Sequence, residues 1–200
     1  MKKIKAIIFD LNGVFIQSRY LSDRFRDDFG VPPAVFMPVL KKTLNKARRP
    51  NERDLFSYWQ KHFRSWDVRL SKELFYSYWF KDEKPFVPMI RLGKKIQQRG
   101  IRMFILSNNF RERAAYYRNT FPFMKKLFTK IYYSWQTGYV KPDPRAYKKI
   151  LRENELEPEE CLYFDDSKHN VAIARKLGIR AYSFSGVKGV ERVLKKISVI

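Results

Sequence analysis

The stretch KAIIFDLNGVF, residues 5–15, constrains the fold more than any other part of the chain, because an apolar run ends there abruptly at an acid. Ile7, Ile8 and Phe9 form a short unbroken apolar run, which is typical of an interior strand of a parallel sheet. Asp10 follows directly. Ligands of open α/β sheets bind beyond the carboxyl ends of the strands, so an acid here is placed for chemistry. A capping or turn aspartate is the alternative for this stretch alone.

The second part of the chain alternates between strand-like and helix-like segments. This alternation predicts βαβ units and a parallel sheet. Further strands are expected at 101–106, 130–134, 161–164 and 180–183, with helices at about 87–98, 110–119, 144–154 and 171–177 and from about 188. We therefore predict an α/β fold with a Rossmann-like parallel sheet as its core.

Residues 17–86 lack strand-like alternation and read as four helices separated by turns, at about 22–29, 33–48, 51–66 and 71–80. Four helices with short loops predict a bundle. Asn51 is the expected N-cap of the third helix. Phe56, Trp59 and Phe63 fall at helical spacing, so the many aromatic residues here are expected mainly to pack a core. The predicted domains are an α/β core (1–16 and 87–200) and an inserted helical cap (17–86).

The composition is strongly basic, with 42 lysine and arginine residues against 20 acidic ones and a net charge of +22. Residues 87–135 alone hold eleven basic residues and one acid. Such a surface attracts anions, nucleic acid among them, although a solvated basic surface without a partner is the simpler interpretation.

The apolar runs and the cysteine count limit the class of protein further. No apolar run approaches the roughly 20 residues that span a bilayer, so we expect a cytoplasmic protein without a membrane partner. Cys161 is the only cysteine, which excludes an internal disulfide and a cysteine-based metal cluster. Oligomeric state leaves no mark in the sequence.

Polar residues follow three of the predicted strands, where each strand ends. These are Asp10, Ser107 and the pair Asp165–Asp166, and Lys141 lies in a loop that enters a helix. Parallel strands would gather these groups along one edge of the sheet. A carboxylate nucleophile, a hydroxyl and an ammonium group for anionic oxygens, and further carboxylates for a hard cation suit phosphoryl transfer with Mg²⁺. The lysine would also screen the acids from one another.

On these residues the sequence resembles the haloacid dehalogenase-like (HAD) superfamily of hydrolases, in the subgroup with a helical cap inserted after the first strand, which includes sugar phosphatases and the N-terminal domains of epoxide hydrolases. The matching segments occur in the family's order and are FDLNGV (9–14), LSN (106–108), GYVKPDP (138–144) and YFDDSKHNVAIARKLGIRA (163–181).

The resemblance implies a Mg²⁺-dependent phosphatase of a small organic phosphate, such as a sugar phosphate. Asp10 would attack phosphorus and form an aspartyl-phosphate intermediate. The main-chain carbonyl of Asn12 would bind Mg²⁺ together with Asp10 and Asp166, and Asp165 would bind the ion directly or through a neighbouring group.

The remaining implied roles concern the phosphoryl oxygens. Ser107 and Lys141 would hold them, and Lys141 would also orient the nucleophile. Asn108 and the backbone amide of Leu11 would add donors. The substrate itself would be a small phosphorylated metabolite.

Asn12 departs from the family pattern, in which a second aspartate at this position protonates the leaving group and then activates water. An amide cannot transfer a proton at neutral pH, and such acid–base help is typically worth about 10²- to 10⁴-fold. We therefore predict slow hydrolysis that favours leaving groups needing little protonation.

Two alternatives stay open. A dehalogenase is one, although those relatives work without metal and lack the acid pair Asp165–Asp166. The other is a catalytically weak or inactive HAD-like protein that binds nucleic acid or an acidic protein through its basic surface.

Overall fold

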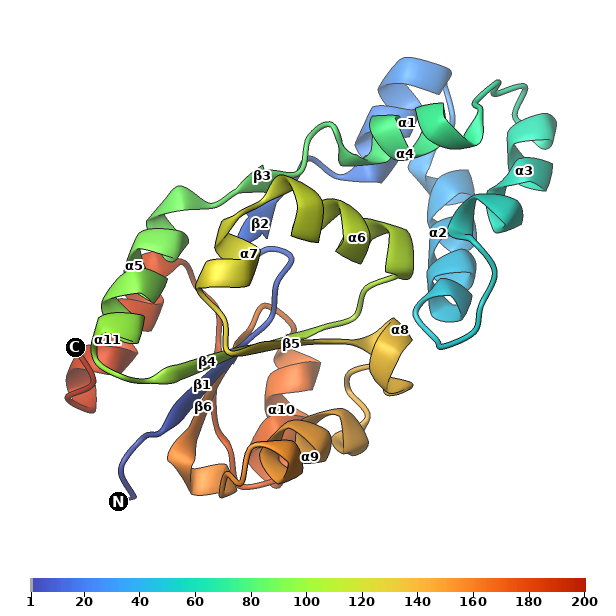
Figure 1. Cartoon of the computed structure of the whole chain (residues 1–200). Helices are drawn as coiled ribbons and strands as arrows, with labels where there is room; N and C mark the ends of the chain where they lie inside the picture. Colours follow the sequence, from blue (N-terminus) through green and yellow to red (C-terminus); the bar gives the residue numbers. More distant parts are fainter. Residues whose placement is uncertain (1) are drawn as a thin grey trace.

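The computed structural model describes residues 2–200; Met1, the first residue of the predicted segment 1–16, lies outside them. One sheet has five parallel strands in the order β5-β4-β1-β6-β7 (Figure 1). Their bounds are Ala6–Phe9 (β1), Arg102–Ser107 (β4), Lys130–Tyr133 (β5), Cys161–Asp165 (β6) and Arg180–Ser183 (β7). The prediction of a parallel α/β core is confirmed.

The central strand sets the position of the candidate catalytic groups. Phe9 at the end of β1 lies opposite Ile105 of β4 and Phe164 of β6. Asp10, Ser107 and Asp165 therefore come to the same edge of the sheet, within about one residue of each other along the strands.

Alternate residues of the strands face two separate apolar layers, which is why helices cover both faces. Ile7 and Phe9 pack into one layer, while Ala6 and Ile8 pack into the other. The first layer includes residues of α5 (Val87–Gln98), α6 (Arg111–Thr120) and α11 (Val187–Lys196); the second includes residues of α9 (Pro144–Glu153) and α10 (Lys168–Lys176). The result is a three-layer α/β/α arrangement (Figure 1).

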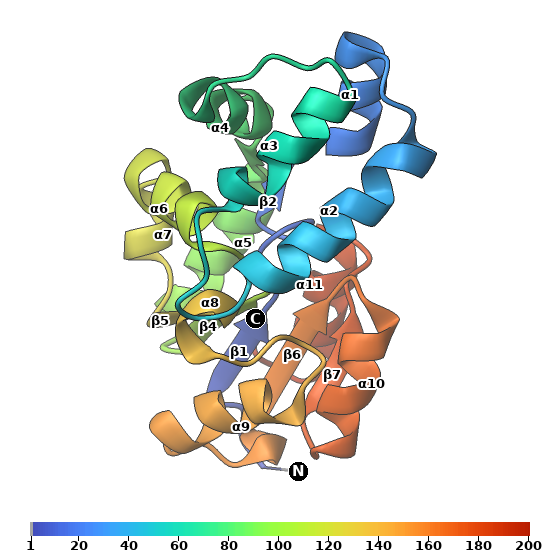
Figure 2. The same ribbon diagram turned by 90° about the vertical axis from the view of Figure 1, so that its right-hand side faces the viewer.

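Four helices form a separate group beside the sheet (Figure 2). They are α1 (Leu21–Phe29), α2 (Pro33–Ala47), α3 (Leu55–Ser65) and α4 (Lys72–Phe80). Their core is aromatic and centres on Trp59, which is fully buried against Phe36, Phe63 and Phe75. The prediction that aromatic residues at helical spacing pack a core is confirmed. Phe110, from the loop after β4, joins the same cluster and ties it to the α/β core.

The predicted N-cap of the third helix was wrong. Helix α3 begins at Leu55, and the side chain of Asp54 accepts a hydrogen bond of 3.0 Å from the amide of Phe56. Asn51 instead occupies a turn with φ = 59°, a left-handed conformation that asparagine tolerates better than most residues. Asparagine and aspartate are both good N-cap residues. Because Asn51 lies in the turn, the helix begins later and is capped by Asp54.

The prediction that residues 17–86 contain no strand was also wrong at the two ends of this segment. Strand β2 (Ile16–Gln17) pairs antiparallel with β3 (Lys84–Pro85), so the chain enters and leaves the four-helix group through one short ribbon. Two-residue strands are too short to produce a period in the sequence.

Three short elements were not predicted either: α7 (Phe123–Lys126), α8 (Ser134–Thr137) and the 3₁₀ turn η1 (Pro158–Glu160). Among residues 2–200, no helix combines the length and the apolar character needed to cross a membrane.

Candidate active site

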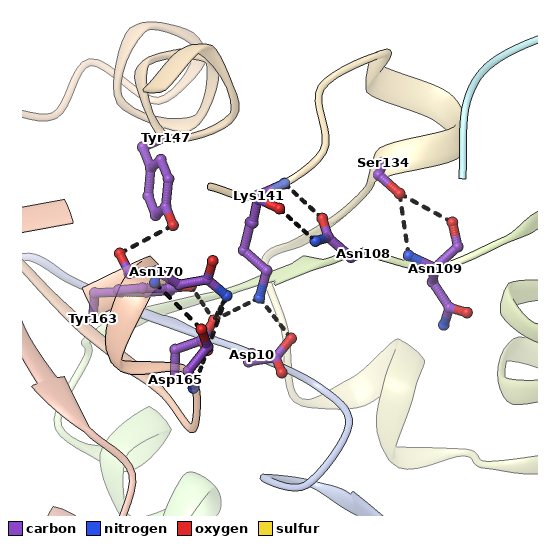
Figure 3. Close-up of polar contacts among 10 residues, drawn as sticks. Asp10, Asn108, Asn109, Ser134, Lys141, Tyr147, Tyr163, Asp165 and Asn170 are labelled. Atoms are coloured by element: carbon purple, nitrogen blue, oxygen red, sulfur yellow. Dashed lines mark hydrogen bonds and ion pairs between the residues drawn. The ribbon is translucent and has the colours of Figure 1, made fainter. Parts of the chain in front are cut away.

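Lys141 lies at the centre of the site and bridges two carboxylates. Its Nζ donates hydrogen bonds of 2.7 Å to Asp10 Oδ1 and 2.7 Å to Asp165 Oδ2 (Figure 3). The Lys141 side chain is 2% exposed and that of Asp165 is fully buried. Burial raises the pKa of Asp10 to about 6, although the charge of Lys141 opposes this shift. The predicted gathering of these three groups at one edge of the sheet agrees with this geometry.

Asp165 is held by a ring of donors. It accepts hydrogen bonds from the hydroxyl of Tyr163, from the amide of Ser167 at 2.8 Å, and from Asn170 Nδ2 at 3.1 Å to each carboxylate oxygen. Burial disfavours its charge, but Lys141 and these donors together keep the pKa of Asp165 below its ordinary value. With both oxygens engaged, Asp165 serves best as a fixed anion that positions Lys141.

Asn108 fixes the backbone of Lys141. Its Nδ2 donates to the carbonyl of Lys141 at 2.8 Å, and its Oδ1 accepts from the Lys141 amide at 2.7 Å. The adjacent Asn109 is fastened in turn by Ser134, whose Oγ bonds both to the amide and to the carbonyl of Asn109 at 3.1 Å (Figure 3). The Asn108 side chain thus joins the end of β4 to the loop that contains Lys141. Both its amide nitrogen and its amide oxygen are already engaged in these hydrogen bonds.

Three acids meet where a cation would bind. One carboxylate oxygen from each of Asp10, Asp165 and Asp166 lies within 4.8 Å of the others. Asp166 is the most exposed of the three acids. Its carboxylate is still partly shielded from solvent, and this desolvation together with the negative charge of Asp165 raises the pKa of Asp166. Hard oxygen donors of this kind fit Mg²⁺. Gly13 makes room for Asp166, because a Cβ there would lie 2.8 Å from Asp166 Oδ2 and the backbone φ of +83° favours glycine.

Ser107 and Leu11 lie next to Asp10. The Ser107 hydroxyl is buried and has no hydrogen-bond partner among residues 2–200. A buried donor of this kind is costly unless a ligand satisfies it. The Leu11 backbone forms a hydrogen bond that lowers the pKa of Asp10, so its amide lies beside the Asp10 carboxylate.

A pocket of about 200 Å³ opens above these groups. Its lining consists of Asp10, Asn12, Arg48, Ser107, Asn108, Arg113, Lys141, Asp166 and Asn170. Each of these side chains is polar or charged. Such a lining suits a small, strongly polar ligand.

Asn12 has a side chain turned into a buried network. Its Nδ2 donates a 2.6 Å hydrogen bond to the hydroxyl of Tyr117, which donates at 2.6 Å to Glu83 Oε2. Glu83 Oε1 forms a 2.6 Å ion pair with Arg113. Tyr117 is fully buried, so the network positions Asn12 and offers no exposed acid in its place.

Sequence reasoning missed several of these residues. Asn170 carries a signal that could have been used, since a residue in the first turn of a helix after β6 can reach back to Asp165. Arg48, Glu83 and Tyr117 carry none, because their contacts with the site depend on how segments distant in the chain pack together.

The fold and the donor set agree with a known family. The family model for haloacid dehalogenase-like hydrolases matches residues 4–178. The chain belongs to this HAD-like hydrolase family. Among curated relatives, bifunctional epoxide hydrolase 2 from Sus scrofa is 24% identical to this HAD-like chain over 98% of the chain and 39% of the relative. The phosphorylated carbohydrates phosphatase of Thermotoga maritima is 24% identical over 88% of the chain and 82% of the relative.

Solved structures share the fold. A HAD family enzyme from Bacteroides thetaiotaomicron superposes with a TM-score of 0.81 at 19% identity, covering 96% of this chain and 99% of that chain. The same enzyme in complex with magnesium and inorganic phosphate gives a TM-score of 0.73 at 20% identity over 90% and 93%. The HAD-like chain spans less than two fifths of the length of three curated relatives that it matches.

Proposed function

We propose that this hydrolase is a Mg²⁺-dependent phosphatase that acts on a small organic phosphate through an aspartyl-phosphate on Asp10. The observation that carries the proposal is the buried ammonium of Lys141 shared by Asp10 and Asp165, with Asp166 beside them. Two relatives support it by name, the phosphorylated carbohydrates phosphatase and the magnesium- and phosphate-binding HAD enzyme.

The first step transfers the phosphoryl group to the enzyme. The carboxylate oxygen of Asp10 forms a bond to phosphorus as the bond from phosphorus to the leaving-group oxygen breaks. Lys141 fixes the rotation of the carboxylate and neutralises charge. The free hydroxyl of Ser107 and the amide of Leu11 donate to the phosphoryl oxygens.

Mg²⁺, when bound, neutralises charge on the transferred group. Asp10, Asp166 and the main-chain carbonyl of Asn12 would hold it. The oxygens of Asp165 already accept hydrogen bonds from Lys141 and Asn170. Asp165 would therefore affect the ion through these two side chains.

The second step is hydrolysis of the intermediate. Water attacks phosphorus, the bond between phosphorus and the Asp10 oxygen breaks, and inorganic phosphate leaves. Asn12 supplies no proton in the first step and takes none in the second, because its amide does not titrate at neutral pH. We therefore expect slow turnover and a preference for leaving groups of low pKa, such as phenols, acyl groups and anomeric hydroxyls.

The acid cluster favours this chemistry over dehalogenation. Asp10 alone would suffice to attack carbon, and a further exposed carboxylate at Asp166 would repel the carboxylate of a haloacid. A bound cation removes that repulsion and gives Asp166 a function.

The test is phosphate release from a panel of small phosphates with Mg²⁺, run on the wild type, Asp10→Asn and Asn12→Asp. Turnover should vanish in Asp10→Asn and with a chelator. It should rise in Asn12→Asp, by as much as about 10²- to 10⁴-fold if a full general acid is restored. Silence of both the wild type and Asn12→Asp on every substrate would refute a phosphatase.

The basic surface supports a separate prediction. Nine of the eleven basic residues in 87–135 are exposed, and binding of nucleic acid there would weaken steeply with salt and ignore Mg²⁺. Phosphate release would instead require Mg²⁺, so the two activities separate in one set of titrations.

A further inference from the structure

Two arginines from different parts of the chain share the pocket with Asp10. Arg48 follows the last turn of α2 in the helical insertion, and Arg113 lies in the first turn of α6. Figures 1 and 2 both place the C-terminal end of α2 beside α8 of the core, and Ala47 and residues 49–53 line a second pocket together with Trp135 and Gln136. The four-helix group therefore delivers Arg48 to the catalytic edge.

Arg48 is a half-buried cation with no hydrogen-bonded acid of its own in the described residues. Its Nε is buried without a hydrogen-bond partner, and it forms no ion pair with any acid in the described part of the chain. Burial and the like charge of Arg113 lower the pKa of Arg48 to about 10, although the negative charge of Asp10 opposes this shift, so Arg48 remains charged at neutral pH. A buried Nε without a partner, beside a second arginine, is a donor that a bound anion can satisfy, so the arrangement points to an anionic ligand.

Arg113 is fixed on one side and free on the other. Its Nη2 forms the 2.6 Å ion pair with Glu83, and its Nε is buried with no partner. Glu83 is itself held by Tyr117. The guanidinium is thus oriented before a ligand arrives, which lowers the entropy lost on binding.

The transferred phosphoryl group does not need these two arginines. Lys141, the Ser107 hydroxyl and the Leu11 amide already surround it in the proposed reaction, together with the cation. Guanidinium groups match planar carboxylates through paired hydrogen bonds. The two arginines line the same pocket of about 200 Å³ as Asp10 and Lys141, so an anion that they bind lies close to the phosphoryl group.

We propose that Arg48 and Arg113 bind a carboxylate on the leaving group, so that the substrates are small organic phosphates whose leaving group carries a carboxylate. This inference rests on the proposed phosphatase activity and narrows its substrate class. The carboxylate bridges the helical insertion and the α/β core, because Arg48 belongs to the first and Arg113 to the second.

The test compares two esters that differ only at this position. 3-Phosphoglycerate carries a carboxylate where glycerol 1-phosphate carries a hydroxymethyl group. With Mg²⁺ present, kcat/KM of the wild type should be higher for 3-phosphoglycerate. Arg48→Gln should lower it about 10- to 100-fold for that ester, the range typical of a charge-assisted pair, and no more than about 3-fold for glycerol 1-phosphate.

Arg49→Gln is the matched control. Arg49 is the next residue in the chain, is exposed, and lines the second pocket instead of the catalytic one. Its replacement removes the same charge and should leave kcat/KM unchanged for both esters. Equal losses of kcat/KM on both esters in Arg48→Gln, or no preference of the wild type for the carboxylate, would overturn the inference.

Failure of the phosphatase proposal gives a different result. The wild type would then turn over neither ester. Calorimetry on Asp10→Asn and on Asp10→Asn with Arg48→Gln still tests the subsite, because it needs no turnover. Tighter binding of 3-phosphoglycerate than of glycerol 1-phosphate, lost in the double variant, would support the carboxylate site. Equal binding of the two esters would refute it.

Discussion

Replacement of Lys141 by methionine should destabilise the fold strongly, because Lys141 is the cation shared by two carboxylates. The methionine retains most of the side-chain volume, so the change removes charge with little loss of packing. It leaves Asp10 and Asp165 close together with no shared cation, where the structure has two hydrogen bonds of 2.7 Å.

The magnitude follows from burial. Asp165 is fully buried and Asp10 is 13% exposed. Removing one partner of a buried ion pair typically costs about 3–5 kcal/mol. For a domain of this size, each kcal/mol lowers the melting temperature by about 2–4 °C, so the expected loss is about 6–20 °C.

Thermal unfolding followed by circular dichroism measures this loss. Lys149→Met is the control, since Lys149 pairs with Glu153 at 2.6 Å on the partly exposed face of α9, and such a pair contributes less than about 1 kcal/mol. Added Mg²⁺ should recover part of the Lys141→Met deficit by restoring positive charge between the acids. A deficit equal to that of the control would refute the reasoning.

The deficit should also depend on pH. The pKa of Asp10 is raised to about 6, so its favourable contribution to stability is present below its ordinary pKa of 3.8 and is lost as the pH rises through 6. Without Lys141 the pKa of Asp10 rises further. The difference between wild type and Lys141→Met should therefore shrink between pH 8 and pH 5, and a difference that grows on acidification would contradict this assignment.

Two other outcomes follow from the contacts. Asn108→Leu removes both hydrogen bonds to the Lys141 backbone and should lower kcat while leaving Mg²⁺ affinity, measured by calorimetry, near that of the wild type; a matching loss of Mg²⁺ affinity would count against a role through Lys141. Burial raises the pKa of the Cys161 thiol to about 12, so a thiol reagent at pH 8 should modify the protein only in denaturant, and rapid modification of the native protein would contradict this burial.

The sequence was sufficient for the core and its edge because these depend on short-range signals. Each buried strand is a compact apolar run, and the polar residues that follow Phe9, Leu106 and Phe164 meet once the strands are parallel. Register follows from this packing, since a shift by one residue would turn every side chain to the opposite layer.

The remainder of the pocket could not be predicted because it depends on contacts between distant segments. Arg48 reaches Asp10 only through the placement of α2 against the core, and Asn12 finds Tyr117 at a separation of 105 residues. The N-cap of α3 is Asp54 instead of the predicted Asn51 for a similar reason on a smaller scale, because the turn that contains Asn51 fixes where α3 can begin.

The β2–β3 ribbon has a consequence for how such a chain can diversify. Ile16 lies opposite Pro85 and Gln17 opposite Lys84, so the two ends of the four-helix insertion are hydrogen-bonded neighbours. The entropic cost of holding these two ends together therefore depends little on how long a segment lies between them, because the entropy of closing a loop grows only slowly with its length. Helices there can be lengthened, exchanged or lost with little penalty to the sheet. New side chains can thus be presented to an unchanged set of reacting groups.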